Sequence, residues 1–230
     1  MASLDTVRVR LAPFFVLAVA YVVASPPPST IAVLLKCLPI ACLCGFVITD
    51  TLIPVRHSNL VYKYNIAIIA GLVLSGIGDA ALVYVDDHDL FVIGLLFFAL
   101  AHLSYIKAFG WRPVNVKTLL ICFTLMCLGY SMVYQGLVKH NLASLGGLYS
   151  VILMLMGWRA LAGARLTDNR WSLTKMAAPV GAIFFCISDF VLVMNRFFTP
   201  IPSSQMLVMS TYYAGQLGIA FSVLDRDFNT

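Results

Sequence analysis

The feature that most constrains this chain is a succession of apolar runs, each about 20 residues long, separated by short charged or proline-rich breaks. A helix needs about 20 predominantly apolar residues to cross the hydrocarbon core of a bilayer. Of the 230 residues, 61% are hydrophobic and 11% are charged, whereas a soluble domain is about 45–50% apolar and about 25% charged. The sequence therefore predicts an all-α polytopic membrane bundle.

Dividing the sequence at these breaks predicts eight transmembrane helices in a single integral membrane domain, residues 1–230. The expected helices cover residues 9–25, 30–49, 65–85, 90–109, 116–135, 144–162, 175–195 and 203–223. The first apolar run, Leu11–Ser25, also resembles a signal peptide that could be cleaved after Ser25. Three prolines follow directly and make a poor cleavage site, so we expect this run to be the first spanning helix.

Basic residues concentrate in the loops on one side of the predicted bundle. Twelve share the side of the N-terminus, whereas only Lys139 and Arg196 lie on the opposite side, with the acidic turn Asp86–Asp89. Cytoplasmic loops are enriched in Lys and Arg, so both termini are expected to be cytoplasmic. Because the basic residues form no stripe, no nucleic-acid partner is expected. The twelve are Arg8, Arg10, Arg56, Lys63, Lys107, Arg112, Lys117, Arg159, Arg165, Arg170, Lys175 and Arg226.

The cysteines indicate neither a disulfide framework nor a metal site. All six lie in apolar runs, and no two have the CxxC spacing, so we interpret them as small buried hydrophobic residues. The sequence also has no zinc-ligand spacing, no GxSxG elbow and no P-loop. We therefore expect no metal and no cofactor.

Two apolar stretches carry an aspartate in a shared pattern. Gly71–Val83 contains Asp79 and Gly181–Val193 contains Asp189; in both, a glycine lies eight residues before the aspartate and Leu-Val follows it at the third and fourth positions. A carboxylate at membrane depth costs at least about 2.5–3.5 kcal/mol, so each needs a partner, a proton or a water-filled cavity. The two stretches are four spans apart and run in the same direction, which favours two parallel four-helix half-repeats, residues 1–112 and 113–230.

Lys36 is the only lysine deep inside a predicted span, away from the span ends, and it lies at about the same depth as the two aspartates. From the 1.5 Å rise per helical residue, this depth is roughly 9 Å below the non-cytoplasmic face. We expect the three groups to form one site. The alternatives are a purely structural ion pair, or a Lys36 side chain that reaches to the interface.

Other polar residues lie in the fourth and eighth spans. His102 is placed roughly 9 Å deeper than Asp79, so direct contact between them is not expected. It is either a hydrogen-bonded packing residue or part of the site. Tyr212 and Tyr213 cannot both face lipid, and we expect one of them to point inward at the level of the aspartates.

At these motifs the sequence resembles the YhhN-like family of membrane proteins, whose animal members include lysoplasmalogenases. The fifth and sixth spans contribute nothing distinctive to the resemblance, which otherwise covers nearly the whole chain. It rests on Lys36-Cys37-Leu38-Pro39, Gly78-Asp79, Leu82, Phe97, Phe98, His102, Tyr105, Phe185, Ser188-Asp189, Leu192, Tyr212-Tyr213 and Gln216.

The resemblance implies hydrolysis of the vinyl-ether bond of lysoplasmalogens, which gives a fatty aldehyde and glycerophosphoethanolamine or glycerophosphocholine. A vinyl ether hydrolyses by protonation at carbon, which calls for one carboxylic acid and a second carboxylate, as in glycosidases. We expect Asp79 and Asp189 to be this catalytic pair, with the acid and base roles unassigned. The expected substrate-binding residues are Lys36, His102, Tyr105, Ser188, Tyr212, Tyr213 and Gln216.

Two other functions are compatible with the same residues. A lipid or small-molecule transporter is the main alternative, because parallel repeats and intramembrane ionisable residues are also typical of transporters. A receptor or assembly factor without chemistry is the third. For the hydrolase, the expected partners are a lysophospholipid substrate in the bilayer and membrane lipids. The resemblance to animal members implies the endoplasmic reticulum membrane, and we leave open whether the chain forms a homodimer.

Overall fold

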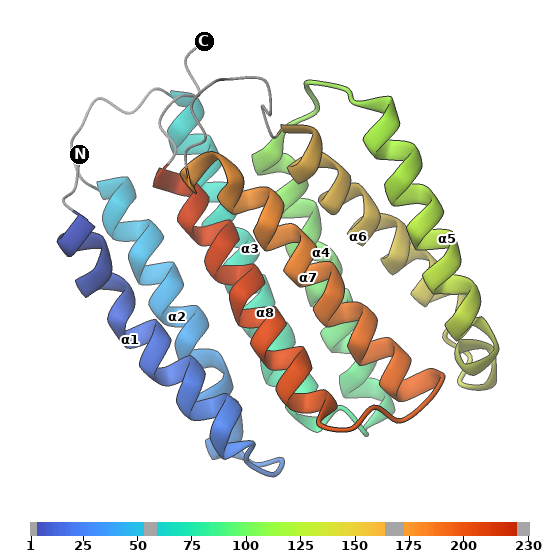
Figure 1. Ribbon diagram of the computed structural model, residues 1–230. Coiled ribbons are helices and arrows are strands. Elements are labelled where there is room, and N and C mark those ends of the chain that lie inside the picture. The colour runs from blue at the N-terminus through green and yellow to red at the C-terminus, as the bar shows by residue number, and fades with distance from the viewer. Residues whose placement is uncertain (1–3, 53–58, 164–172, 225–230) are drawn as a thin grey trace.

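The computed structural model describes residues 4–52, 59–163 and 173–224, which form eight helices long and apolar enough to cross a membrane (Figure 1). No strand occurs in these ranges, and the predicted all-α bundle of eight spans is confirmed. Short 3-10 helices, Leu82–Tyr84 and Ser222–Leu224, extend the third and eighth spans. The helices are α1 (Leu4–Ala24), α2 (Thr30–Leu52), α3 (Asn59–Ala81), α4 (His88–Phe109), α5 (Val116–Lys139), α6 (Ala143–Gly163), α7 (Leu173–Phe197) and α8 (Ser204–Phe221).

The helix ends differ from the prediction mainly where a helix continues into polar sequence. α1 begins at Leu4 instead of residue 9, α3 begins at Asn59 instead of residue 65, and α5 continues to Lys139 instead of residue 135. Hydropathy marks the part of a helix that lies in hydrocarbon, whereas its backbone hydrogen bonds continue into the headgroup region. The apolar run therefore locates each span but underestimates the length of these helices.

Successive helices alternate in direction, so α1 begins and α8 ends at the same end of the bundle (Figure 1). By their helix ends, eight of the basic residues assigned to the N-terminal side belong to this end, while Lys139 and Arg196 belong to the other. Arg56, Arg165, Arg170 and Arg226, which the prediction also counted, lie outside the described residues. The eight are Arg8, Arg10, Lys63, Lys107, Arg112, Lys117, Arg159 and Lys175.

Two helix pairs approach so closely that their contacts require glycine. Between α7 and α8, a Cβ atom added to Gly181 would lie 2.7 Å from the carbonyl oxygen of Gly215. Between α3 and α4, a Cβ added to Gly78 would lie 3.3 Å from the carbonyl oxygen of Gly94. Small residues let helix backbones approach in lipid, where no hydrophobic effect drives the helices together. These two pairs, α3–α4 and α7–α8, carry the two intramembrane aspartates.

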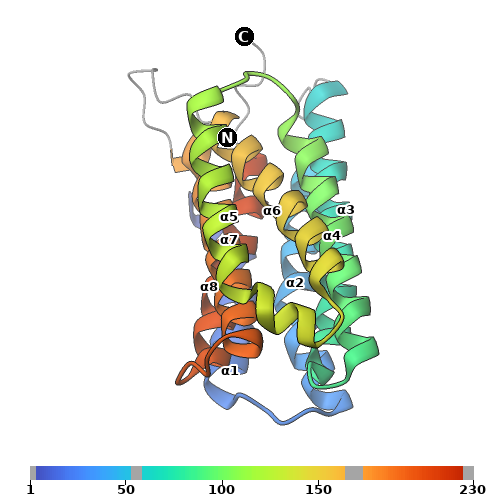
Figure 2. The same ribbon diagram turned by 90° about the vertical axis from the view of Figure 1, so that its right-hand side faces the viewer.

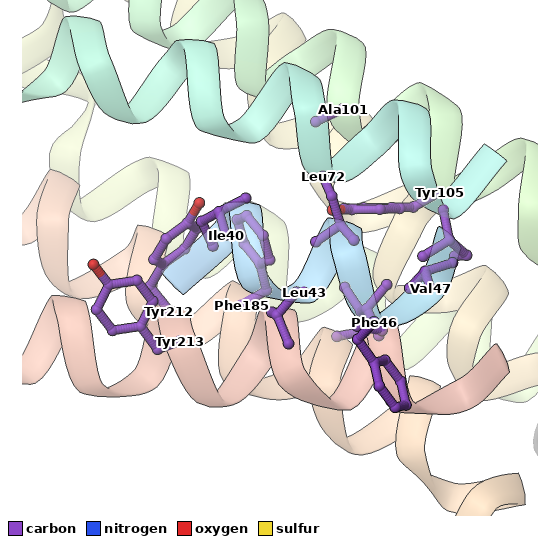
Figure 3. Packing of buried hydrophobic residues seen from close by; sticks show 14 of the residues in the cluster. Ile40, Leu43, Phe46, Val47, Leu72, Ala101, Tyr105, Phe185, Tyr212 and Tyr213 are labelled. Carbon is purple, nitrogen blue, oxygen red and sulfur yellow. The ribbon is translucent and has the colours of Figure 1, made fainter. Parts of the chain in front are cut away.

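The main apolar core fills the space between these pairs and the neighbouring helices α1, α2 and α6. Figure 3 shows Tyr212, Tyr213 and Phe185 next to Ile40 and Leu43 in this core. Aromatic side chains from α8 and α7 therefore meet aliphatic side chains from α2 directly beside the first aspartate-bearing helix. This packing fixes the rotation of α8 relative to α2 and α3.

α5 lies at the edge of the bundle, next to α6 and α7, and α6 crosses between α5 and α4 (Figure 2). Only Val133 and Leu137 of α5 are buried. They belong to a smaller apolar cluster with Phe91 of α4 and Phe197 of α7. α5 is therefore attached to the bundle through this cluster and through its neighbours α6 and α7.

Candidate active site

Asp79 lies near the C-terminal end of α3 and is 2% exposed. Each of its carboxylate oxygens has its own partner. Nζ of Lys36 on α2 lies 3.5 Å from Oδ1, and the hydroxyl of Tyr212 on α8 donates to Oδ2 at 2.5 Å. A cation and a phenol donor stabilise the charged form of a carboxylate, which is otherwise costly at this depth.

A second layer of hydrogen bonds holds the partners of Asp79 in place. Nε2 of Gln216 donates to the hydroxyl oxygen of Tyr212 at 3.3 Å, and the hydroxyl of Tyr105 donates to Oε1 of Gln216 at 2.7 Å. The hydroxyl of Tyr213 donates to the backbone carbonyl of Lys36 at 2.9 Å. We expected one of the two adjacent tyrosines to point inward. In the structure both Tyr212 and Tyr213 are buried.

Asp189 on α7 forms the second part of the site, together with residues from α4 and α6. The hydroxyl of Tyr149 donates to Oδ2 of Asp189 at 2.6 Å. Nε2 of His102 lies 3.6 Å from the same carboxylate oxygen and 3.1 Å from the Tyr149 hydroxyl. The side chain of Asp189 is 15% exposed, whereas His102 is fully buried. This carboxylate is therefore the more accessible of the two.

The two carboxylates do not touch each other. Across the described residues, no hydrogen bond or ion pair joins Asp79 to Asp189, and of the two aspartates Lys36 pairs only with Asp79. A chain of ring contacts links them instead: the ring centroid of Tyr212 lies 5.4 Å from that of Phe185, which lies 4.8 Å from that of His102. The expected single cluster of Lys36 and both aspartates is thus divided into two neighbouring parts.

As the sequence analysis expected, His102 forms no hydrogen bond or ion pair with Asp79 in the described part of the chain; it contacts Asp189 instead. Ser188, expected to line the pocket, is buried, and its hydroxyl donates to the backbone carbonyl of Val208 at 3.0 Å. That bond ties α7 to α8. Ser188 therefore serves helix packing in this structure, although it directly precedes Asp189.

Tyr149 is the residue of this network that the sequence analysis did not name, and it lies in the sixth span, which contributes nothing distinctive to the resemblance. It lies six residues after the start of α6, just as Lys36 lies six residues after the start of α2. Two glycines, Gly146 and Gly147, precede it and let α5 approach α6 closely. A tyrosine hydroxyl at that depth, shortly after two glycines, is the sequence signal that could have identified Tyr149.

The site consists of acid, base and phenol side chains. Within the described ranges, no group of three or more His, Cys, Asp or Glu side chains is close enough to hold a metal ion. An apolar surface hollow lies on one face of α1 and is separate from the polar network. Six residues of α1 line it: Phe15, Val16, Val19, Ala20, Val23 and Ala24.

Comparisons with known proteins agree with this architecture. The human protein "Lysoplasmalogenase TMEM86A" is 40% identical over 219 residues, which cover 94% of this chain and 89% of that protein. The human "Lysoplasmalogenase TMEM86B" is 36% identical over 196 residues, which cover 85% of this chain and 76% of that protein. The Rattus norvegicus protein of the same name is 35% identical over 224 residues, which cover 95% of this chain and 85% of that protein. No solved structure matches. The YhhN family model matches residues 31–223, from the start of α2 to the end of the eighth span, and this chain belongs to the YhhN family.

Proposed function

We propose that this protein is a membrane hydrolase that cleaves the vinyl-ether bond of lysoplasmalogens. Its relatives named lysoplasmalogenase match it over most of both chains, which supports this reaction class. The observation that carries the proposal is the pair of intramembrane carboxylates, each held by specific donors and linked by the rings of Tyr212, Phe185 and His102. Such a site would provide acid–base groups inside the membrane-spanning part of the bundle.

The chemistry of a vinyl ether fits this arrangement. A proton adds to the carbon distant from oxygen, which leaves an oxocarbenium cation on the carbon bonded to oxygen. Water adds to that carbon and loses a proton, and the resulting hemiacetal breaks its C–O bond. The products are a fatty aldehyde and a glycerophospho-alcohol, and one water is consumed. The reaction therefore needs a proton donor, a group that stabilises a cation and a group that accepts a proton from water.

Asp79 and Asp189 would divide these tasks, as paired carboxylates do in glycosidases. One donates the proton, and the charge of the other stabilises the cation, because charges interact strongly in a water-poor site. The faces of the intervening aromatic rings also attract a cation. Lys36, Tyr105, Tyr213 and Gln216 keep the Asp79 side in place, with no direct role in bond breaking.

The test is hydrolysis of a lysoplasmalogen by the purified protein in detergent or liposomes, measured as aldehyde released. Asp79→Asn and Asp189→Asn are each expected to lower turnover at least about 100-fold, since positioned acid–base groups contribute about 10²–10⁴-fold. Asp89→Asn, on an exposed acid in the first turn of α4, is the matched control and should leave turnover unchanged. Near-normal turnover in either folded site variant would remove the catalytic pair. A lyso-ester lipid of the same headgroup should not be cleaved.

The helices that carry the aspartates do not favour the transporter alternative. Transporter sites are typically built on discontinuous helices. α7 continues unbroken through Pro179, ten residues before Asp189, and α3 is continuous through Asp79. Counterflow of lipid between liposomes without release of aldehyde would support transport instead.

The sidedness and the location of the protein are also part of the proposal. We place both termini in the cytoplasm, because the described basic residues at that end outnumber those at the other end by eight to two. We place the protein in the endoplasmic reticulum membrane on the resemblance to animal members. Protease protection of terminal tags in sealed microsomes tests the sidedness, and co-fractionation with endoplasmic reticulum membranes tests the location.

A further inference from the structure

The partners of the two aspartates are exchanged between the two halves of the chain. His102 lies 23 residues after Asp79, and Tyr212 lies 23 residues after Asp189. Yet His102 contacts Asp189, and Tyr212 contacts Asp79. Each carboxylate is therefore contacted by the residue that occupies the same position in the other half.

The packing contacts within each half keep the same register. A Cβ added to Gly78, one residue before Asp79, would meet Phe98, which follows that aspartate by 19 residues. Ser188, one residue before Asp189, donates to the carbonyl of Val208, which also follows its aspartate by 19 residues. The helix pairs α3–α4 and α7–α8 thus place equivalent residues at equivalent contacts.

Each carboxylate also has a partner from the preceding helix, and here the two halves differ in charge. For Asp79 this partner is Lys36 on α2, and for Asp189 it is Tyr149 on α6. One carboxylate therefore has a cation beside it, and the other has a neutral phenol. Environments that differ in this way are what separate the acid from the base in paired carboxylates.

The hydrogen bonds at Asp189 leave one carboxylate oxygen available. The Tyr149 hydroxyl has a single proton and donates it to Oδ2, so its oxygen can only accept a hydrogen bond from Nε2–H of His102. Oδ2 is thereby held from one side by Tyr149 and approached from another by His102. Oδ1 has no hydrogen bond or ion pair to any described residue, whereas both oxygens of Asp79 are engaged.

We propose that Tyr149 is the positioning residue of the site, and that it presents Oδ1 of Asp189 to the vinyl ether as the proton-donating oxygen. It takes at Asp189 the place that Lys36 takes at Asp79. Tyr149 acts through Asp189 and His102 and does not itself exchange a proton with the substrate. This inference rests on the proposed hydrolase function.

The test compares steady-state kinetics of Tyr149→Phe with those of the wild-type protein. The substitution keeps the ring and its edge contact with His102, at 5.6 Å between centroids, and removes only the hydroxyl. Because a small misplacement of a reacting group can cost about 10²-fold, kcat should fall about 10- to 100-fold while KM stays within about twofold. Tyr130→Phe on α5 removes a phenol that donates to the carbonyl of Ala143 at the start of α6, and it should leave both constants unchanged.

Each outcome separates this inference from the proposed function. Normal kcat in Tyr149→Phe with an inactive Asp189→Asn would overturn the role of Tyr149 alone. Full activity in Asp189→Asn would overturn the catalytic carboxylate, and absence of hydrolysis by the wild-type protein would overturn both. If Tyr149→Phe does not fold, Tyr149→Gln, which retains a donor, replaces it; the proposal then requires turnover above that of Asp189→Asn with an unchanged KM.

Discussion

Adding one methyl group at Gly181 should force α7 and α8 apart. In Gly181→Ala, the new Cβ would lie 2.7 Å from the carbonyl oxygen of Gly215, 2.7 Å from the backbone nitrogen of Ile219 and 3.0 Å from the carbonyl carbon of Gly218. All three are backbone atoms, so no side-chain rotation can relieve the contacts. Ordinary van der Waals contact begins at 3.4 Å, and the helices must therefore separate by several tenths of an ångström.

The energetic cost follows from two opposing effects. Overpacking costs about 1–3 kcal/mol. Replacing a helical glycine with alanine returns about 0.5–1 kcal/mol. We expect a net loss of about 1–2 kcal/mol, seen as a lower midpoint of thermal unfolding in detergent. Because α8 also carries Tyr212, whose hydroxyl donates to Asp79 at 2.5 Å, hydrolysis should fall as well.

Gly45→Ala on α2 is the matched control. No atom outside its own helix backbone lies within 4 Å of the added Cβ, so this variant should gain about 0.5–1 kcal/mol without loss of activity. Equal unfolding midpoints and equal turnover in the two variants would refute the reasoning, because the only relevant difference between them is the contact with α8.

Three further substitutions give distinct results. Lys36→Met removes the cation beside buried Asp79 and should cost about 3 kcal/mol and at least tenfold in turnover; unchanged thermal unfolding would contradict the ion pair. Arg159→Met removes bonds of 2.5 and 2.8 Å from a buried guanidinium to two backbone carbonyls of the α4–α5 connection. It should cost about 2–4 kcal/mol with KM unchanged, and a large rise in KM would place Arg159 in the site instead. Ser188→Ala loses one hydrogen bond and should cost about 1 kcal/mol with normal kinetics; loss of turnover would show that the hydroxyl has a role beyond packing.

The number and order of the helices could be predicted because a bilayer imposes one length on every span. Apolar runs of about 20 residues admit few alternatives in hydrocarbon, where every backbone group must be bonded within its own helix. Hydropathy could not predict the residue at which each helix begins or ends. α3 begins at Asn59, six residues before its expected start, because the first turns of that helix carry polar side chains.

Apart from Tyr149, the polar residues of the site could be named individually, but their pairing could not be predicted. Polar side chains inside a span are costly, and that alone singled out Lys36, Asp79, His102 and Asp189. Depth measured from the helix ends placed Asp189 with Lys36 and placed His102 deeper. The structure instead pairs Asp189 with His102, since helices cross at angles and end at different levels. Contacts also depend on the rotation of each helix, which the close packing of α3 on α4 and of α7 on α8 determines.

The exchange of partners between the halves also has a consequence for biosynthesis. Spans leave the ribosome in order, so Asp79 arrives in α3 long before Tyr212 in α8 has been made. During that interval Lys36, made earlier on α2, can supply a counter-charge. Asp189 arrives after both of its partners, His102 and Tyr149, have already been made. Asp79, the carboxylate that is synthesised first, is therefore also the one that has a lysine on the preceding helix.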